Sequence, residues 1–260
     1  VFDIKIVRHS IDARKKNNIH HVYTLDFSTN IRLKLPGPKD YLYKEIRVDK
    51  YLESPPVIVG FGPCGMFAAL ILAEGGYKPI VIERGSAIEE RVGKVKRFWT
   101  KGILDTECNV QFGEGGAGTF SDGKLTSGIK DPRKRKVLES FVRFGANPEI
   151  MYEQKPHIGT DVLRGIVKNL RDRIIELGGQ VLFDTKLEEV EISDGRVSGA
   201  VVRHGNERDL IKTSNLIIAI GHSARDTFSM LNDIGLEMEQ KPFSIGVRID
   251  HPQNVIDEGQ

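Results

Sequence analysis

Residues 57–65 read VIVGFGPCG, and this stretch sets the fold class expected for the whole chain. The apolar run at 57–59 predicts a strand that is buried on both faces, as in a parallel sheet. Helix-forming residues fill 63–73 and a glycine pair ends them, after which KPIVIE at 78–83 predicts a second buried strand. A strand, a helix and a second strand in this order form one right-handed crossover unit.

Three glycines in the turn of this unit, Gly60, Gly62 and Gly65, match the pattern G-x-G-x-x-G. In that pattern the first glycine permits the tight turn, the second lets the backbone approach a pyrophosphate, and the third lets helix and strand pack closely. The positive end of the helix dipole and its free N–H groups then attract the anion. The alternative is a glycine turn that binds no ligand, but the strand–turn–helix context favours a dinucleotide site.

Glu83 closes the second strand beside Arg84 and lies 23 positions after Gly60. A carboxylate at this place accepts hydrogen bonds from both ribose hydroxyls of an adenosine and repels a 2′-phosphate, which disfavours NADP here. The alternative is a solvated glutamate that only accompanies Arg84. We therefore expect Glu83 and Arg84 at the adenosine end of a site that could take either FAD or NAD.

A glycine-rich loop and a late buried strand bring further bare backbone to this site. Residues 111–124 read QFGEGGAGTFSDGK, and the N–H groups of such a loop can surround a phosphate or the polar edge of a flavin. A three-stranded meander with turns at 193–195 and 204–206 precedes LIIAI at 216–220, after which Gly221 allows a cofactor to approach closely. Three further helices are predicted, at 86–101, 132–144 and 161–177.

With these motifs the sequence resembles the two-dinucleotide-binding-domain flavoproteins. More narrowly, it resembles the bacterial FAD-dependent dehydrogenases, also called NAD(P)/FAD-dependent oxidoreductases. The likeness rests on VIVGFGPCGMFAALILAEGG and IERG in the crossover unit, NVQFGEGGAGTFSDGKLTSG, LIIAIGHSARDT, KPFSIGVRIDHPQ and the early IVRHSIDARKK. By this resemblance the cofactor-binding residues would be Gly60, Gly62 and Gly65 at the pyrophosphate, Glu83 at the ribose, Gly115, Gly116 and Gly118 along the cofactor, and the backbone of Val190 at the adenine.

The resemblance implies an FAD-dependent oxidoreductase of unknown substrate, in which the isoalloxazine ring carries the redox chemistry and the protein supplies binding and electrostatics. NAD(P)H is the candidate electron donor. Members of this family continue well past this length, so we expect residues 244–260 to enter a substrate domain that is cut short. The alternatives are a non-catalytic or tRNA-modifying flavoprotein and an NAD-only dehydrogenase.

We expect an α/β fold, a Rossmann-like doubly wound parallel sheet with an accessory antiparallel β-meander, preceded by a small α+β N-terminal domain. In that domain alternating apolar residues predict strands at 2–7 and 23–27, with a short basic helix capped by Ser10 between them. The expected domains are 1–50 for the N-terminal domain and linker, 51–240 for FAD binding, and 241–260 for the start of a cap domain.

The motifs leave the catalytic residues undetermined. The candidates near the flavin are Asp122 and Lys124 in the glycine-rich loop and His222 after the last strand. A lysine in that place would stabilise the anionic reduced flavin.

Composition restricts the partners of the chain. With 38 basic and 36 acidic residues the net charge is +2, which gives no electrostatic reason to expect nucleic acid or an anionic membrane. The basic run at 130–136 is accordingly interpreted as a solvated helix start. The two cysteines, Cys64 and Cys108, cannot form a disulfide framework and neither lies in a CxxC pair, which fits a reducing cytoplasm. We expect no metal site. The expected partner is a small-molecule substrate of unknown identity.

Overall fold

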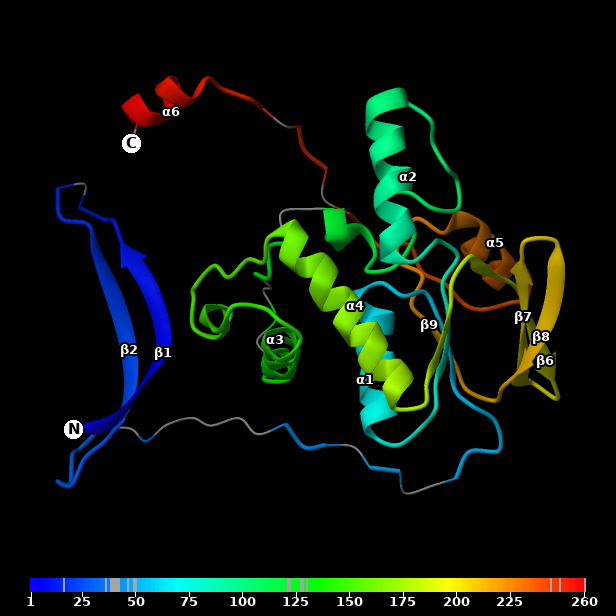
Figure 1. Ribbon diagram of the computed structural model, residues 1–260, viewed down its shortest axis with the longest axis horizontal. Helices are drawn as coiled ribbons and strands as arrows, with labels where there is room; N and C mark the ends of the chain where they lie inside the picture. Colours follow the sequence, from blue (N-terminus) through cyan, green and yellow to red (C-terminus); the bar gives the residue numbers. More distant parts are fainter. Residues whose placement is uncertain are drawn as a thin grey trace.

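Figure 1 shows the computed structural model of the chain, which describes residues 1–15, 17–35, 37, 43–45, 47–48, 51–120, 123–126, 129, 131–243, 245–247 and 249–259. The strands are β1 (Phe2–Asp12), β2 (His20–Ser28), β3 (Val57–Val59), β4 (Ile80–Ile82), β5 (Gln180–Leu182), β6 (Thr185–Ser193), β7 (Arg196–His204), β8 (Glu207–Lys212) and β9 (Leu216–Ile218). The helices are α1 (Pro63–Glu74), α2 (Ile88–Lys101), α3 (Lys134–Arg143), α4 (Thr160–Glu176), α5 (Arg225–Asp233) and α6 (Gln253–Gly259), with short 3-10 helices η1 (Ala117–Phe120) and η2 (Pro148–Met151).

The N-terminal unit is a β-hairpin, so the short helix predicted from Ser10 is wrong, and the described residues of this unit contain no helix. Strand β1 continues through Asp12, and its Ser10 pairs with Val22 of β2 while Asp12 pairs with His20. The Asp12 carboxylate accepts hydrogen bonds from the backbone N–H and the guanidinium of Arg14. Such a local aspartate contact forms a turn, which is why the chain reverses here rather than starting a helix.

The central sheet has four parallel strands in the order β5-β4-β3-β9. Val57 of β3 lies in register with Ile80 of β4 on one side and with Leu216 of β9 on the other. The chain therefore moves from β3 to β4 and β5 in one direction and returns to the opposite side of β3 for β9. Ligands of such sheets bind outside the carboxyl ends of the strands at the point where the strand order reverses.

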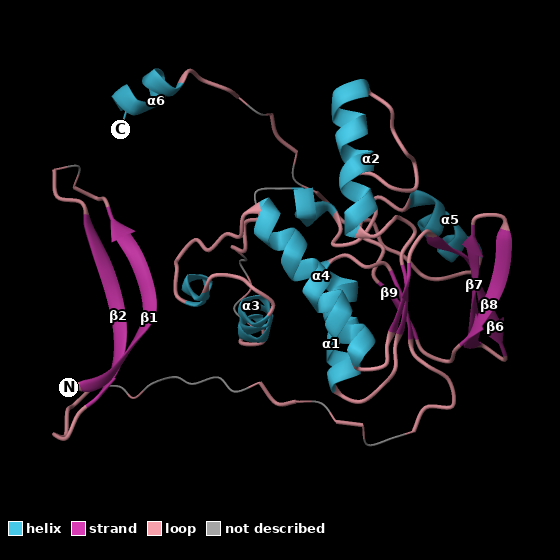
Figure 2. Ribbon diagram, in the orientation of Figure 1, coloured by secondary structure: helices cyan, strands magenta, loops and turns pink. Residues whose placement is uncertain are grey.

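The two faces of this sheet are covered by different layers. Ile58 and Val81 lie in one core with α1 and α4, where Leu170 is fully buried. Val59 and Ile82 lie in a second core against the meander β6–β8 and α5. Figure 2 shows the resulting order of helices, parallel sheet and meander. The predicted fold class, an α/β parallel sheet with an accessory antiparallel meander, is confirmed.

Sequence patterns also predicted the main helices correctly. The segments expected at 86–101, 132–144 and 161–177 are α2, α3 and α4, with small shifts at their ends. Before β3, the backbone N–H of Val48 donates to the carbonyl of Gly75 at 2.8 Å, which attaches the preceding segment to the end of α1. Within the described ranges no helix has the length and apolar composition needed to cross a membrane.

Candidate nucleotide-binding site

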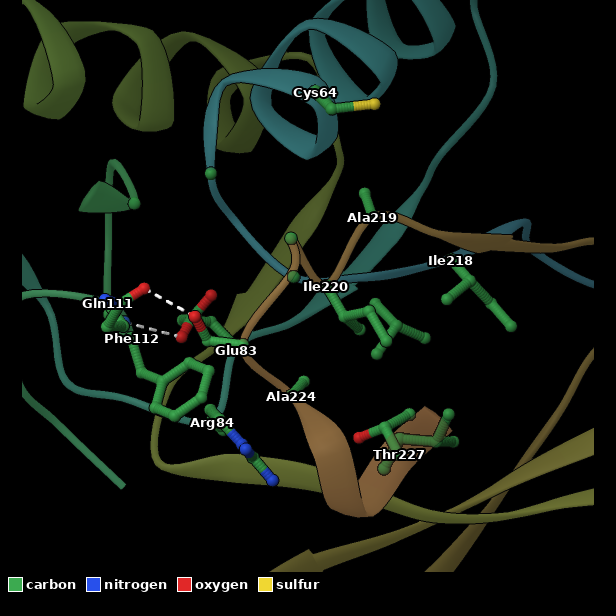
Figure 3. Close-up of a pocket in the computed structure, with 18 of the residues that line it drawn as sticks. Cys64, Glu83, Arg84, Gln111, Phe112, Ile218, Ala219, Ile220, Ala224 and Thr227 are labelled. Atoms are coloured by element: carbon green, nitrogen blue, oxygen red, sulfur yellow. Dashed lines mark hydrogen bonds between the residues drawn. The ribbon is translucent and has the colours of Figure 1, made fainter. Parts of the chain in front are cut away.

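A cavity of about 510 Å3 opens at the carboxyl ends of β3, β4 and β9 (Figure 3). Its walls come from the turn after β3, from Glu83 and Arg84 after β4, and from residues 218–224 around the end of β9. The loop 111–118 and residues 185–187 at the start of the meander complete the lining. This volume is in the range of small-molecule and cofactor sites, and its position is the one expected for a ligand of this sheet type.

The glycines of the turn after β3 serve three different steric purposes. Gly60 has a positive φ of 97°, and a Cβ there would lie 2.5 Å from the carbonyl oxygen of Ala219. A Cβ on Gly65 would lie 1.9 Å from the carbonyl oxygen of Gly60, so this glycine lets α1 pack on the turn. A Cβ on Gly62 would meet only the Cα of Gly116, at 3.7 Å. Gly62 therefore keeps space open in the cavity rather than in the protein core.

Helix α1 points its N-terminus into this cavity. It starts at Pro63, and Gly62 in the N-cap position has no side chain that could cap it. The first intrahelical bond runs from the N–H of Met66 to the carbonyl of Gly62, at 2.9 Å. The N–H groups of Cys64 and Gly65 precede that bond and have no acceptor within the helix. Free N–H groups at a helix N-terminus can bind an anion, and the helix dipole favours this further.

The Glu83 carboxylate is buried and holds three loops together. Its Oε2 accepts the backbone N–H of Phe61 at 2.7 Å, while Oε1 accepts those of Gly85 at 2.9 Å and Gly113 at 2.8 Å. Each carboxylate oxygen has two lone pairs, so these bonds leave one acceptor position, on Oε2. Glu83 lines the cavity, but it has capacity for one ribose hydroxyl rather than for two. Its main role in the structure is to fix the walls of the site.

A buried arginine shapes the glycine-rich loop. Arg91 of α2 is fully buried and donates to the carbonyl oxygens of Asn109 and Val110, at 3.1 Å each, and of Gly113 and Glu114. Burial lowers the pKa of the Arg91 guanidinium to about 10, which still leaves it charged at neutral pH. Because one guanidinium binds four carbonyls, the loop has a defined shape despite its glycines.

Glu114 connects the same loop to two helices. Its Oε2 accepts the backbone N–H of Ile88 at 2.7 Å and the guanidinium of Arg171 at 2.8 Å. The other oxygen, Oε1, is buried and has no hydrogen-bond partner among the described residues. Burial raises the pKa of Glu114 to about 7, although the Ile88 N–H and the Arg171 charge oppose the shift.

Two cations and two carboxylates form a network at the meander side of the cavity. Arg84 Nη2 and Lys186 Nζ lie 2.5 Å and 2.6 Å from the same oxygen of Asp226. Glu107 approaches the two cations at 3.3 Å and 3.8 Å, and the Arg84 guanidinium lies over the ring of Phe112. Burial disfavours the charged Asp226, but the hydrogen bonds from Arg84 and Lys186 outweigh it and hold the pKa of Asp226 below its ordinary value.

A polar contact joins the glycine-rich loop to the segment after β9. Ser223 donates from its hydroxyl to the side-chain oxygen of Gln111 at 2.6 Å. His222 is exposed and lines the cavity, with Nε2 3.3 Å from the same hydroxyl. No group of three or more metal-ligating side chains occurs among the residues that the structure describes.

The structure brings most of the predicted site residues to one cavity and leaves others away from it. The lining includes Gly60, Gly62, Glu83, Arg84, Gly116, Gly118, Gly221 and His222. Gly65 and Gly115 lie behind the wall, where the N–H of Gly115 donates to the carbonyl of Phe61 at 2.9 Å.

Val190 and Lys124 lie outside the lining. Val190 is buried in the core beneath the meander, whereas the meander reaches the cavity through residues 185–187. Lys124 is exposed and forms an isolated antiparallel bridge with His157. Asp122 lies outside the described residues. The roles predicted for Val190, Lys124 and Asp122 stay predictions.

The residues of the site that were not predicted from the sequence include Arg91, Lys186 and Ser223. Arg91 carries one signal, because it lies between Ile88 and Val95 on the buried face of α2, where an arginine needs a partner. Lys186 and Ser223 carry no local signal, since only the path of the chain places them at the cavity.

Comparison with known proteins relates the chain to several sequences. A family model described as "Domain of unknown function (DUF8436)" matches residues 1–28. An uncharacterized protein of Clostridium beijerinckii is 48% identical over 271 aligned positions, which cover 99% of this chain and 49% of that protein. The chain thus spans about half the length of that relative. The thiamine thiazole synthases of Thermotoga maritima and Aeropyrum pernix are 28% and 24% identical, covering 76% and 70% of this chain and 72% and 55% of those proteins.

Solved structures show weaker likenesses. THI4 of Thermovibrio ammonificans has a TM-score of 0.46 at 18% identity, covering 71% of this chain and 64% of that one. Glycine oxidase of Bacillus cereus has a TM-score of 0.38 at 13% identity, covering 71% of this chain and 60% of that one. Both TM-scores lie below 0.5.

Proposed function

We propose that this chain is the part of a flavin-dependent oxidoreductase that binds the adenosine diphosphate of FAD. The proposal rests on one observation. An uncapped helix N-terminus at Gly62, a buried carboxylate at Glu83 and the glycine-rich loop around Gly116 converge on one cavity. These are the groups that bind the pyrophosphate and ribose of a dinucleotide at the switch point of a parallel sheet.

The residues present fit such a ligand. A Cβ at Gly118 or Gly221 would meet no protein atom within 4 Å, so these glycines border open space in the cavity. We assign the pyrophosphate to the N-terminus of α1, where Cys64 lines the cavity, and one ribose hydroxyl to the remaining acceptor position of Glu83. FAD, when bound, supplies the redox chemistry, and the chain supplies binding, orientation and a fixed electrostatic environment.

Calorimetric titration with ADP, FAD and FMN tests this assignment. ADP and FAD share the adenosine diphosphate, and FMN lacks it. We expect ADP and FAD to bind and FMN to bind at least tenfold more weakly than either. Equal binding of FMN, or no binding of ADP, would place the ligand in a different site.

Flavin reduction separates the proposed dehydrogenase from a non-catalytic or tRNA-modifying flavoprotein. A dehydrogenase that takes electrons from NAD(P)H loses its flavin absorbance when NADH or NADPH is added without oxygen. The test is best made on the FAD-loaded chain and on its Clostridium beijerinckii relative, of which this chain spans about half. A flavin that keeps its absorbance with both donors would exclude NAD(P)H as the electron source.

A further inference from the structure

Arg84 and Lys186 form a charged network with two carboxylates at the cavity. The proposed nucleotide site does not explain why these two cations are paired with carboxylates. Arg84 and Lys186 both line the cavity, and each is bound by Asp226 from the first turn of α5. Glu107 is the second carboxylate of the network, at longer distances. Two cations and two carboxylates sum to no net charge, although two positive side chains lie in the wall of the site.

This arrangement bears on which adenosine ligands the site accepts. An arginine near the ribose carboxylate is the feature that accommodates a 2′-phosphate in NADP-binding sites. The opposing repulsion from Glu83 is weakened here, because three backbone N–H groups already bind that carboxylate. The side chains that line the wall would therefore allow a 2′-phosphate if Arg84 and Lys186 were available to bind it.

We propose that Asp226 is a specificity-determining residue, which engages Arg84 and Lys186 so that the site takes an adenosine with a free 2′-hydroxyl and rejects a 2′-phosphate. This inference rests on the nucleotide site proposed above. Both cations bind Oδ2 of Asp226, and Oδ1 accepts the N–H of Thr227, so the carboxylate is held in place by its own helix. A 2′-phosphate would have to displace Asp226 from both cations, whereas a hydroxyl would not.

Titration with ADP-ribose and with its 2′-phosphate tests the proposal, because the two ligands differ only at that position. The wild-type chain should prefer ADP-ribose by at least tenfold. In Asp226→Asn the side chain keeps its shape and loses its charge, so the preference should fall at least tenfold, the effect of about one charged hydrogen bond. Asp226→Glu should keep the preference, and Glu107→Gln should reduce it less because its contacts are longer. Asp233→Asn, at the exposed end of α5, is the matched control.

The outcomes separate this inference from the nucleotide site itself. If wild type binds ADP-ribose but Asp226→Asn keeps the wild-type ratio of affinities, Asp226 does not set specificity and the nucleotide site stands. The same holds if wild type binds both ligands equally. If wild type binds neither ligand, the nucleotide site fails and this inference fails with it.

Discussion

Gly62 allows nucleotide binding to be tested apart from folding. Its φ is −77°, and a Cβ would lie 3.7 Å from the Cα of Gly116, so alanine fits the backbone. We expect Gly62→Ala to fold normally and to bind ADP at least tenfold more weakly, a loss of about 1.4 kcal/mol, because the methyl group occupies ligand space. The control is Gly165→Ala in α4, where a Cβ meets no atom within 4 Å. Unchanged ADP affinity by calorimetry would contradict the placement of the pyrophosphate.

Glu83 should matter for stability as much as for ligand binding. In Glu83→Gln an amide NH2 replaces one oxygen and faces backbone N–H groups that need an acceptor. We expect the free energy of unfolding to fall by about 3 kcal/mol, the order of one charged hydrogen bond lost with a buried donor left unpaired. Urea unfolding measures this, with the exposed Glu90→Gln as the control. A variant that is as stable as wild type but no longer binds ADP would show that Glu83 acts mainly in ligand binding.

Between elements, Glu114 should make the attachment of the glycine-rich loop to α2 and α4 depend on pH. The folded-state pKa of about 7 lies above the ordinary value of 4.5, so the folded chain binds this proton more tightly than the unfolded chain. The contribution of this tighter proton binding to the free energy of unfolding is fully present below pH 4.5 and is lost as pH rises through about 7. At 1.36 kcal/mol per pKa unit the effect is of the order of 3 kcal/mol.

Substitution of Glu114 checks that pH dependence. Glu114→Gln is neutral at every pH, so the difference in unfolding free energy between wild type and variant should change across this window. Urea unfolding at pH 5 and at pH 8 measures it. A constant difference at both pH values would mean that Glu114 stays charged throughout, held by Arg171.

For the molecule as a whole, the hairpin should open independently of the parallel sheet. β1 contacts the segment that follows η2 through His9, whose Nδ1 lies 2.6 Å from Glu153 Oε1 and whose backbone bonds Tyr152 and Gln154. An isolated two-stranded hairpin is marginal in water. We expect His9→Ala to speed hydrogen exchange of β1 and β2 amides at least tenfold and to leave β3 and β4 unchanged.

The exposed Lys5→Ala in β1 is the control for that measurement. Equal acceleration in the hairpin and in the parallel sheet would show that the two unfold as one unit.

Features that depend on residues close together in the sequence were predicted correctly. Features that depend on contacts with distant residues were not. Val57–Val59 was predicted as a buried parallel strand because burial on both faces requires a continuous apolar run. The helix expected from Ser10 failed because a serine before basic residues also fits a strand, and pairing with Val22 on β2 decided between them. Cavity residues that belong to motifs, such as Gly62 and Glu83, were found from the sequence.

The crossover unit, the glycine turn and the glycine-rich loop follow from the sequence alone, because each depends on residues close together in the chain. The sequence does not show which residues the side chains of these motifs bind. Glu83 binds Gly113, 30 positions away, and Arg84 binds Asp226, 142 positions away. Such contacts exist only after the layers pack and bring distant loops to one edge of the sheet. For that reason only the folded chain shows that backbone N–H groups occupy most of the Glu83 carboxylate, and that Arg84 and Lys186 share Asp226.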